Sequence, residues 1–114
     1  MEQIIKKKDI VTNEVTNISK KVLGNKLKKV ILYGSYARGD YNNESDIDLM
    51  IVADIDDKEC TKIQRSIKDS LGYLGLDIGI VISVLVVSKF MFDRYQRSMG
   101  VLINVAREGI ELYA

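Results

Sequence analysis

Two aspartates separated by one residue, Asp46 and Asp48, open the short apolar segment 46–53. In a β-strand, side chains two positions apart point to the same face and lie about 7 Å from one another. Carboxylates this close repel, so both stay ionised only if a cation lies between them or their pKa values move apart. Oxygen ligands select hard cations such as Mg²⁺ or Mn²⁺, which also bind water and phosphate oxygens. The pair therefore predicts a metal site that meets a phosphorylated substrate.

A glycine and a serine, Gly34 and Ser35, follow the first β-rich segment of the chain. Glycine allows close backbone approach to a ligand, and serine offers a hydroxyl and an N–H at an expected helix start. These two residues are candidates for binding phosphate. Arg38, one helical turn later, can add a charge-assisted contact to the same phosphate. Because Arg38 lies near Asp40 and Glu44, the alternative is a surface ion pair.

The third candidate carboxylate is Asp77, the one charged residue in the apolar segment 76–86, which we interpret as a strand. An unpaired charge in such a segment is costly, so we expect Asp77 to be a third metal ligand, with a strand-edge position as the alternative. Alternation places Asp77 and Ser83 on one face of the expected strand. The sequence does not specify the strand register that would bring this face to Asp46. Three carboxylates around two cations beside a phosphate-binding turn would form a two-metal phosphoryl-transfer site.

The elements that position these residues follow from hydrophobic spacing and from helix start and stop signals. The pattern predicts a helix from Asp9 to Val22, strands over 29–33, 46–53 and 76–86, a helix over 57–74 capped by Asp56, a helix from Ser88 to a stop at Gly109, and an extended tail over 110–113. This order predicts an α/β (α+β) fold in which helices pack against a small mixed sheet of three or four strands.

Length and composition limit the function classes. A chain of 114 residues without proline predicts a single domain, 1–114. The absence of histidine excludes imidazole catalysis and histidine-bound zinc. The longest apolar run, 78–87, is half of the about 20 residues that span a bilayer, and the first residues lack the pattern of a secretion signal. We therefore expect a cytoplasmic protein without membrane association.

Charge is distributed unevenly although the net charge is only +1. Residues 1–30 carry eight lysines and three acidic residues, whereas residues 40–60 carry eight acidic residues and one lysine. The basic segment is either a solvated helix face or a contact for an acidic partner. A near-neutral chain of this size has little surface to hold a nucleic-acid template, so we do not expect a polymerase.

Three further side chains have two interpretations each. Tyr36 and Tyr41 flank the candidate phosphate site and could stack on a base, with packing as the alternative. Cys60 lies on the apolar face of its expected helix, which favours a core position over a reactive thiol.

Gly34-Ser35, ten intervening residues and Asp46-Ile47-Asp48 resemble the Gly-Ser-x10-Asp-x-Asp signature of the DNA polymerase β-like nucleotidyltransferase superfamily. The longer match, GSYARGD followed by SDIDL, resembles its minimal nucleotidyltransferases (MNT), as does the ending REGIELY. The resemblance implies the polymerase β-like fold and two Mg²⁺ ions held by Asp46 and Asp48. It also implies that Gly34 and Ser35 bind the nucleoside triphosphate and that Asp77 completes the carboxylate set and helps to deprotonate the acceptor.

The resemblance also implies a reaction and a partner. The expected reaction transfers AMP from ATP to a hydroxyl group, with release of pyrophosphate. Similar minimal proteins are antitoxins that adenylylate a tyrosine of a HEPN-domain toxin, so the expected acceptor is such a toxin. One alternative is a non-catalytic antitoxin module that binds nucleotide or its partner. Another is an adenylyltransferase that acts as a homodimer on a small aminoglycoside-like molecule.

Overall fold

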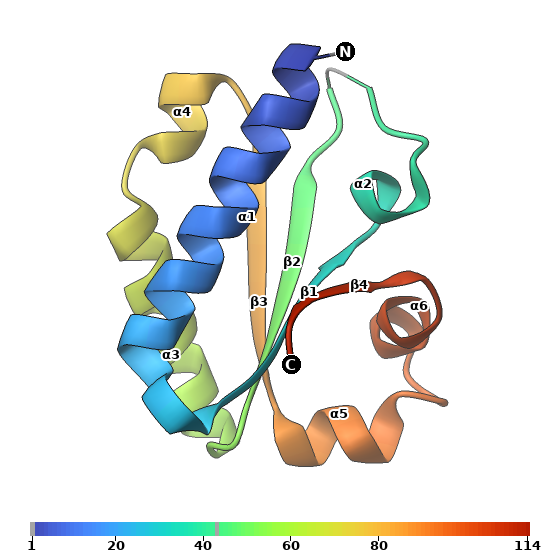
Figure 1. Ribbon diagram of the computed structural model, residues 1–114. Coiled ribbons are helices and arrows are strands. Elements are labelled where there is room, and N and C mark those ends of the chain that lie inside the picture. Colours follow the sequence, from blue (N-terminus) through green and yellow to red (C-terminus); the bar gives the residue numbers. More distant parts are fainter. Residues whose placement is uncertain (1, 43) are drawn as a thin grey trace.

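A mixed sheet of four strands forms the centre of the computed structural model, which describes residues 2–42 and 44–114 (Figure 1). The strands are β1 (Leu27–Tyr33), β2 (Ile47–Ala53), β3 (Ile82–Ser88) and β4 (Ile110–Tyr113). Their order across the sheet is β3-β2-β1-β4. β1 is antiparallel to β2 and to β4, whereas β2 and β3 are parallel. The expected mixed sheet of three or four strands is therefore confirmed, with four.

Helices cover both faces of this sheet (Figure 1). They are α1 (Glu2–Leu23), α2 (Ser35–Arg38), α3 (Asp57–Leu71), α4 (Leu74–Ile78), α5 (Lys89–Tyr95) and α6 (Gly100–Glu108), with a 3-10 turn at Gly24–Lys26. α1 and α3 pack on one face, and α5 and α6 pack on the other. Within the described ranges, no helix has the combination of length and hydrophobicity that a bilayer crossing requires.

Strand β2 is buried on both faces and separates two hydrophobic layers. Leu49 and Ile51 join the layer beneath α1 and α3, whereas Met50 and Val52 join the layer beneath α5 and α6. Side chains alternate along a strand, so the even-numbered positions of β2 all face α5 and α6. Asp48 is therefore the first residue of β2 on that side.

The segment expected as the third strand begins differently. Residues 74–78 form α4, which ends at Gly79 in a left-handed conformation (φ 72°), and β3 begins only at Ile82. A left-handed residue cannot continue a strand. The chain turns back at this point, and the turn is closed by the Ile80 N–H, which donates to the Gly75 carbonyl at 2.8 Å. The prediction of a strand over 76–86 is wrong for its first six residues, which include Asp77.

Three predicted helices also differ from the observed ones, two at their ends and one by dividing in two. The first helix begins at Glu2 rather than Asp9, and α3 ends at Leu71 because the Gly72 N–H closes it onto the Lys68 and Asp69 carbonyls. The expected continuous helix after Ser88 is two helices, α5 and α6, separated by a turn over 96–99. The predicted caps at both starts are confirmed: Asp56 accepts from the Glu59 N–H at 2.8 Å and Ser88 from the Met91 N–H at 3.1 Å.

Strand β3 lies at an edge of the sheet, with β2 on one side only. The Val86 N–H faces away from β2 and donates to the Gln64 side-chain oxygen on α3, at 2.9 Å. α3 therefore supplies a side-chain acceptor to the open edge as well as apolar contacts. Cys60 on the same helix is buried, as expected, and burial together with nearby acidic residues raises its pKa to about 11, so it is a core residue rather than a reactive thiol.

Asp56→Ala removes the side-chain acceptor that caps α3, and we expect the free energy of unfolding to fall by about 1 kcal/mol. Urea denaturation followed by circular dichroism measures this loss. Asp57→Ala is the matched control, since it removes a neighbouring carboxylate and leaves the capping bond intact. Equal losses in the two variants would show that helix-end charge, not the cap, is responsible.

Candidate active site

The candidate site lies where β1 ends and β2 begins. The antiparallel register pairs Tyr33, the last residue of β1, with Asp48. Asp46 precedes the first residue of β2 and is exposed, whereas Asp48 is half-buried. The Ile47 N–H between them donates to the Val81 carbonyl at 2.9 Å, which ties the start of β2 to the chain before β3. Both aspartates are thus held at one end of the central strand.

Gly34 is fitted against the Asp48 carboxylate. Its backbone (φ 74°, ψ −154°) lies in a region that only glycine adopts readily. A Cβ atom at this position would collide with Oδ2 of Asp48. The requirement for glycine is therefore both conformational and steric, and it brings the turn after β1 into direct contact with the metal-binding candidate on β2.

The turn continues as the short helix α2. The Gly34 carbonyl accepts from the N–H groups of Ala37 and Arg38, each at 3.1 Å. The N–H groups of Ser35 and Tyr36 precede these first intrahelical bonds, so they are donors that the helix itself does not use. The expected helix start at Ser35 is confirmed. The Ser35 N–H and hydroxyl therefore directly follow Gly34, the residue that meets Asp48, as a phosphate site at this turn requires.

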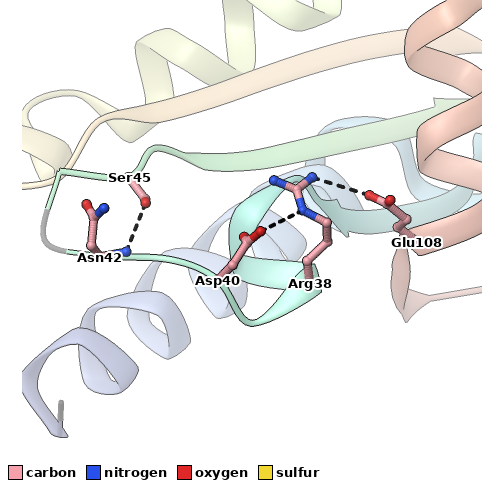
Figure 2. Close-up of polar contacts among 5 residues, drawn as sticks. All are labelled: Arg38, Asp40, Asn42, Ser45 and Glu108. Carbon is pink, nitrogen blue, oxygen red and sulfur yellow. Dashed lines mark hydrogen bonds and ion pairs between the residues drawn. The ribbon is translucent and has the colours of Figure 1, made fainter.

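The loop before Asp46 has its own hydrogen bonds. The Asn42 N–H donates to the Ser45 hydroxyl at 3.0 Å (Figure 2), and the Ser45 N–H donates to the Asn42 carbonyl at 3.1 Å. The Asn42 side-chain oxygen also accepts from the Glu44 N–H at 2.8 Å. Asparagine and serine commonly form such local turns. The turn ends at Ser45, one residue before Asp46, and so helps to fix the backbone position of Asp46.

Arg38 joins two acidic side chains from different elements (Figure 2). Its Nε lies 3.2 Å from Oδ2 of Asp40, and its Nη1 lies 3.3 Å from Oε2 of Glu108 at the end of α6. The alternative of a surface ion pair is thus observed, with Glu108 instead of Glu44 as the second acid. Arg38 also lowers the pKa of Asp48, so its charge acts on the candidate site at the same time.

The charge of Asp46 acts on the Asp48 carboxyl group. Burial raises the pKa of Asp48 above its usual value, the charge of Asp46 raises it further, and Arg38 opposes both effects. Burial and the Asp48 charge also raise the pKa of Tyr33 across the sheet. A half-buried carboxylate whose ionisation is disfavoured by a neighbouring carboxylate indicates a place where a cation would be stabilised.

Tyr36 and Tyr41 pack on each other. Their rings are stacked with centroids 4.4 Å apart and an angle of 4° between the ring planes. Tyr36 is 5% exposed and belongs to the hydrophobic layer beneath α1 and α3. For Tyr36 the packing interpretation is therefore confirmed, and its role is to anchor α2 to the core.

The structure does not bring Asp77 to the aspartate pair. Asp77 is exposed on α4, and its charge is not among the causes that shift the pKa of Asp48. Within residues 2–42 and 44–114, no three acidic or cysteine side chains are grouped closely enough to hold a metal ion. The prediction that Asp77 lies on a strand is wrong, because residues 74–78 form α4. The residue of β3 that pairs with Asp48 is Ser83.

Sequence reasoning missed three neighbours of the site: Tyr33, Ser83 and Glu108. Tyr33 and Ser83 flank Asp48 on the two adjacent strands, and only the strand register reveals this. Glu108 comes from the far end of the chain. Its proximity follows from the pairing of β4 with β1, which no local pattern in the sequence specifies.

Comparison with known protein families decides the classification. The family described as "Polymerase beta, Nucleotidyltransferase" matches residues 13–113. The chain belongs to this family. It is an enzyme of the nucleotidyltransferase class, and the match covers β1, α2 and β2, which together carry the Gly-Ser turn and the aspartate pair.

Individual relatives agree with this family. A protein of Methanocaldococcus jannaschii named "Putative protein adenylyltransferase" is 38% identical over 104 residues, covering 88% of this chain and 92% of the relative. A toxin–antitoxin crystal structure with AMP-PNP has a TM-score of 0.55 at 19% identity, covering 90% of this chain and 73% of the other. The tri-AMPylated Shewanella oneidensis HEPN toxin in complex with MNT antitoxin has a TM-score of 0.51 at 16% identity, covering 94% and 72%. These two likenesses confirm the fold.

Gly34→Ala tests the close approach of the turn to Asp48. We expect it to lower the free energy of unfolding by about 3 kcal/mol or more, because backbone strain adds to a collision with the carboxylate. Gly39→Ala is the matched control: Gly39 also has a positive φ (87°), but a Cβ there would meet nothing within 4 Å. It should cost only about 1–2 kcal/mol of strain. Urea denaturation compares the two, and equal losses would contradict the steric contact.

Asp48→Asn tests the electrostatics of the metal-free site. A carboxyl group whose pKa is raised by folding makes the protein less stable as pH rises above the unfolded-state value, near 3.8. We therefore expect Asp48→Asn to raise the melting temperature at pH 7 in EDTA, by less than about 4 °C. The difference should shrink as the pH is lowered and disappear well below pH 3.8, where Asp48 is largely protonated in both states. A variant that is less stable than wild type at pH 7 would contradict this.

Proposed function

We propose that this protein is a Mg²⁺-dependent protein adenylyltransferase that transfers AMP from ATP to a hydroxyl group of a partner protein. The observation that carries the proposal is the contact between the Gly34 turn and the Asp48 carboxylate, which brings a phosphate-binding candidate and a cation-binding candidate to one point. The relative named a protein adenylyltransferase, which spans nearly the same length, supports the reaction class. The proposal treats residues 1–114 as one nucleotidyltransferase domain.

The turn residues are assigned to the triphosphate. The Ser35 hydroxyl and the N–H groups at the start of α2 donate hydrogen bonds to the β- and γ-phosphate oxygens, and Gly34 lets these oxygens come close to the backbone. Because the same turn touches Asp48, the α-phosphorus would be held at the edge of the aspartate pair. An acceptor hydroxyl then attacks the α-phosphorus in line and gives its proton to water or to a carboxylate of the aspartate pair, while the bond to the β-phosphate breaks and pyrophosphate leaves.

The residues present fit a divalent cation. Asp46 and Asp48 offer carboxylate oxygens on one side of β2, and their mutual repulsion is relieved when a cation lies between them. Mg²⁺ is commonly bound by one or two carboxylates together with phosphate oxygens, so the pair is sufficient when ATP is present. When bound, Mg²⁺ neutralises charge that develops on the phosphates during transfer.

Arg38 is assigned to the triphosphate in the complex with ATP. Its ion pairs with Asp40 and Glu108 are exposed and therefore weak, so a triphosphate competes effectively for its guanidinium group. Arg38 is held at one side of the aspartate pair and on the same helix as Ser35. It thus needs to change only its side-chain conformation to contact phosphate.

A HEPN-domain toxin is the proposed acceptor, which makes this protein an antitoxin. The support is the similarity in fold to the MNT antitoxin bound to a tri-AMPylated HEPN toxin. The exposed lysines of α1, such as Lys6 and Lys20, offer a basic surface to such a partner. The nucleotide is proposed to be ATP, because a structure of the same fold was solved with AMP-PNP.

Transfer of label from α-³²P-ATP to a HEPN-domain protein of the same genome tests this function. With Mg²⁺ we expect wild type to label the partner and Asp46→Asn and Asp48→Asn to reduce labelling by more than about 100-fold, since each removes a ligand of the cation. Asp54→Asn, an exposed aspartate just after the other end of β2, is the control and should keep full activity.

The outcomes separate the alternatives. If wild type and Asp48→Asn both bind the partner tightly and neither labels it, the proposed reaction is wrong and a binding role is favoured. If wild type labels an aminoglycoside and not the protein, the acceptor class is wrong. Gel filtration of the same preparations then determines whether a homodimer completes the acceptor site.

A further inference from the structure

Ser83 is the residue of the neighbouring strand β3 that pairs with Asp48. In the parallel pairing of β2 with β3, Ile47 is opposite Ile82, Asp48 is opposite Ser83 and Leu49 is opposite Val84. Paired residues of adjacent strands point to the same face of a sheet, with Cβ atoms roughly 5 Å apart. The Ser83 side chain is therefore the β3 group nearest to the Asp48 carboxylate.

The packing of the following residues confirms which face Ser83 occupies. Leu85 and Val87, two and four positions after Ser83, contact the layer that contains Met50 and Val52. These in turn lie two and four positions after Asp48. Val84, by contrast, is buried in the opposite layer. Ser83 and Asp48 are thus the first residues of two adjacent rows that continue into the same hydrophobic layer.

A third carboxylate does not reach this row within the described residues. On the other side of Asp48, the β1 neighbour is Tyr33, which has no carboxylate. Among the described residues, no three acidic or cysteine side chains are grouped closely enough to hold a metal ion. Asp77 lies on α4, beyond Gly79 and outside the strand, and it is exposed. The position on β3 where a third ligand would stand is filled by a neutral hydroxyl.

We infer that this protein holds its cations with two carboxylates only, and that Ser83 occupies the position of a third ligand. This inference rests on the proposed function. With one negative charge fewer, the free protein binds divalent cations weakly, and the triphosphate supplies the remaining oxygen ligands. Cation binding is therefore coupled to nucleotide binding, so the site fills when the substrate arrives.

Mn²⁺ binding to the nucleotide-free protein, followed by electron paramagnetic resonance, tests the inference without measuring activity. We expect Ser83→Asp to lower the Kd for Mn²⁺ at least about ten-fold relative to wild type, because it adds a charge beside Asp48. Ser83→Asn has the same shape without the charge and should stay within about two-fold of wild type. Equal affinities of the Asp and Asn variants would overturn the inference.

A second variant, Asp77→Asn, tests whether Asp77 is a ligand. We expect it to fold as wild type does, because Asp77 is exposed. We expect it to leave Mn²⁺ affinity unchanged, and a weaker affinity would overturn the inference by showing that Asp77 is a ligand. Asp48→Asn separates this inference from the proposed function. If Asp48→Asn binds Mn²⁺ as wild type does, the cation site itself is wrong, whatever Ser83 contributes. Thermal melts of each variant establish that the proteins compared are folded.

Discussion

The candidate site depends on the contact of the Gly34 backbone with the Asp48 carboxylate. It exists because β1 and β2 run antiparallel in a register that ends with Tyr33 opposite Asp48, so the next residue must turn across that side chain. Any side chain at position 34 would push the turn away. The start of α2, and with it the placement of Ser35 and Arg38, depends on this one missing Cβ atom.

Local chemistry made much of the site predictable from the sequence. A glycine and serine after a β-rich segment, and two aspartates at strand spacing, each require a particular backbone shape that their own residue types specify. The same holds for Asp56 and Ser88, whose side chains cap helices through bonds to residues three positions away. Interactions this short in sequence can be inferred without knowledge of the tertiary fold.

Features that depend on distant residues could not be inferred in this way. The hydrophobic run before β3 has strand-like composition, but Gly79 adopts a left-handed turn, and only the tertiary fold shows that Asp77 lies on a helix. The pattern predicts one helix after Ser88 because Tyr95, Met99, Leu102 and Ala106 keep helical spacing across the break between α5 and α6. The ion pair of Arg38 with Glu108 joins residues 70 positions apart.

The bond from the Val86 N–H to Gln64 has a consequence for how this molecule meets other chains. An open edge strand invites a foreign strand to extend the sheet, which is a common route to aggregation. Here the amide in the middle of the β3 edge is already occupied by a side chain of the same molecule, so an incoming strand would first have to displace it. Association by backbone pairing along β3 is thereby disfavoured, and recognition at this edge is left to side chains.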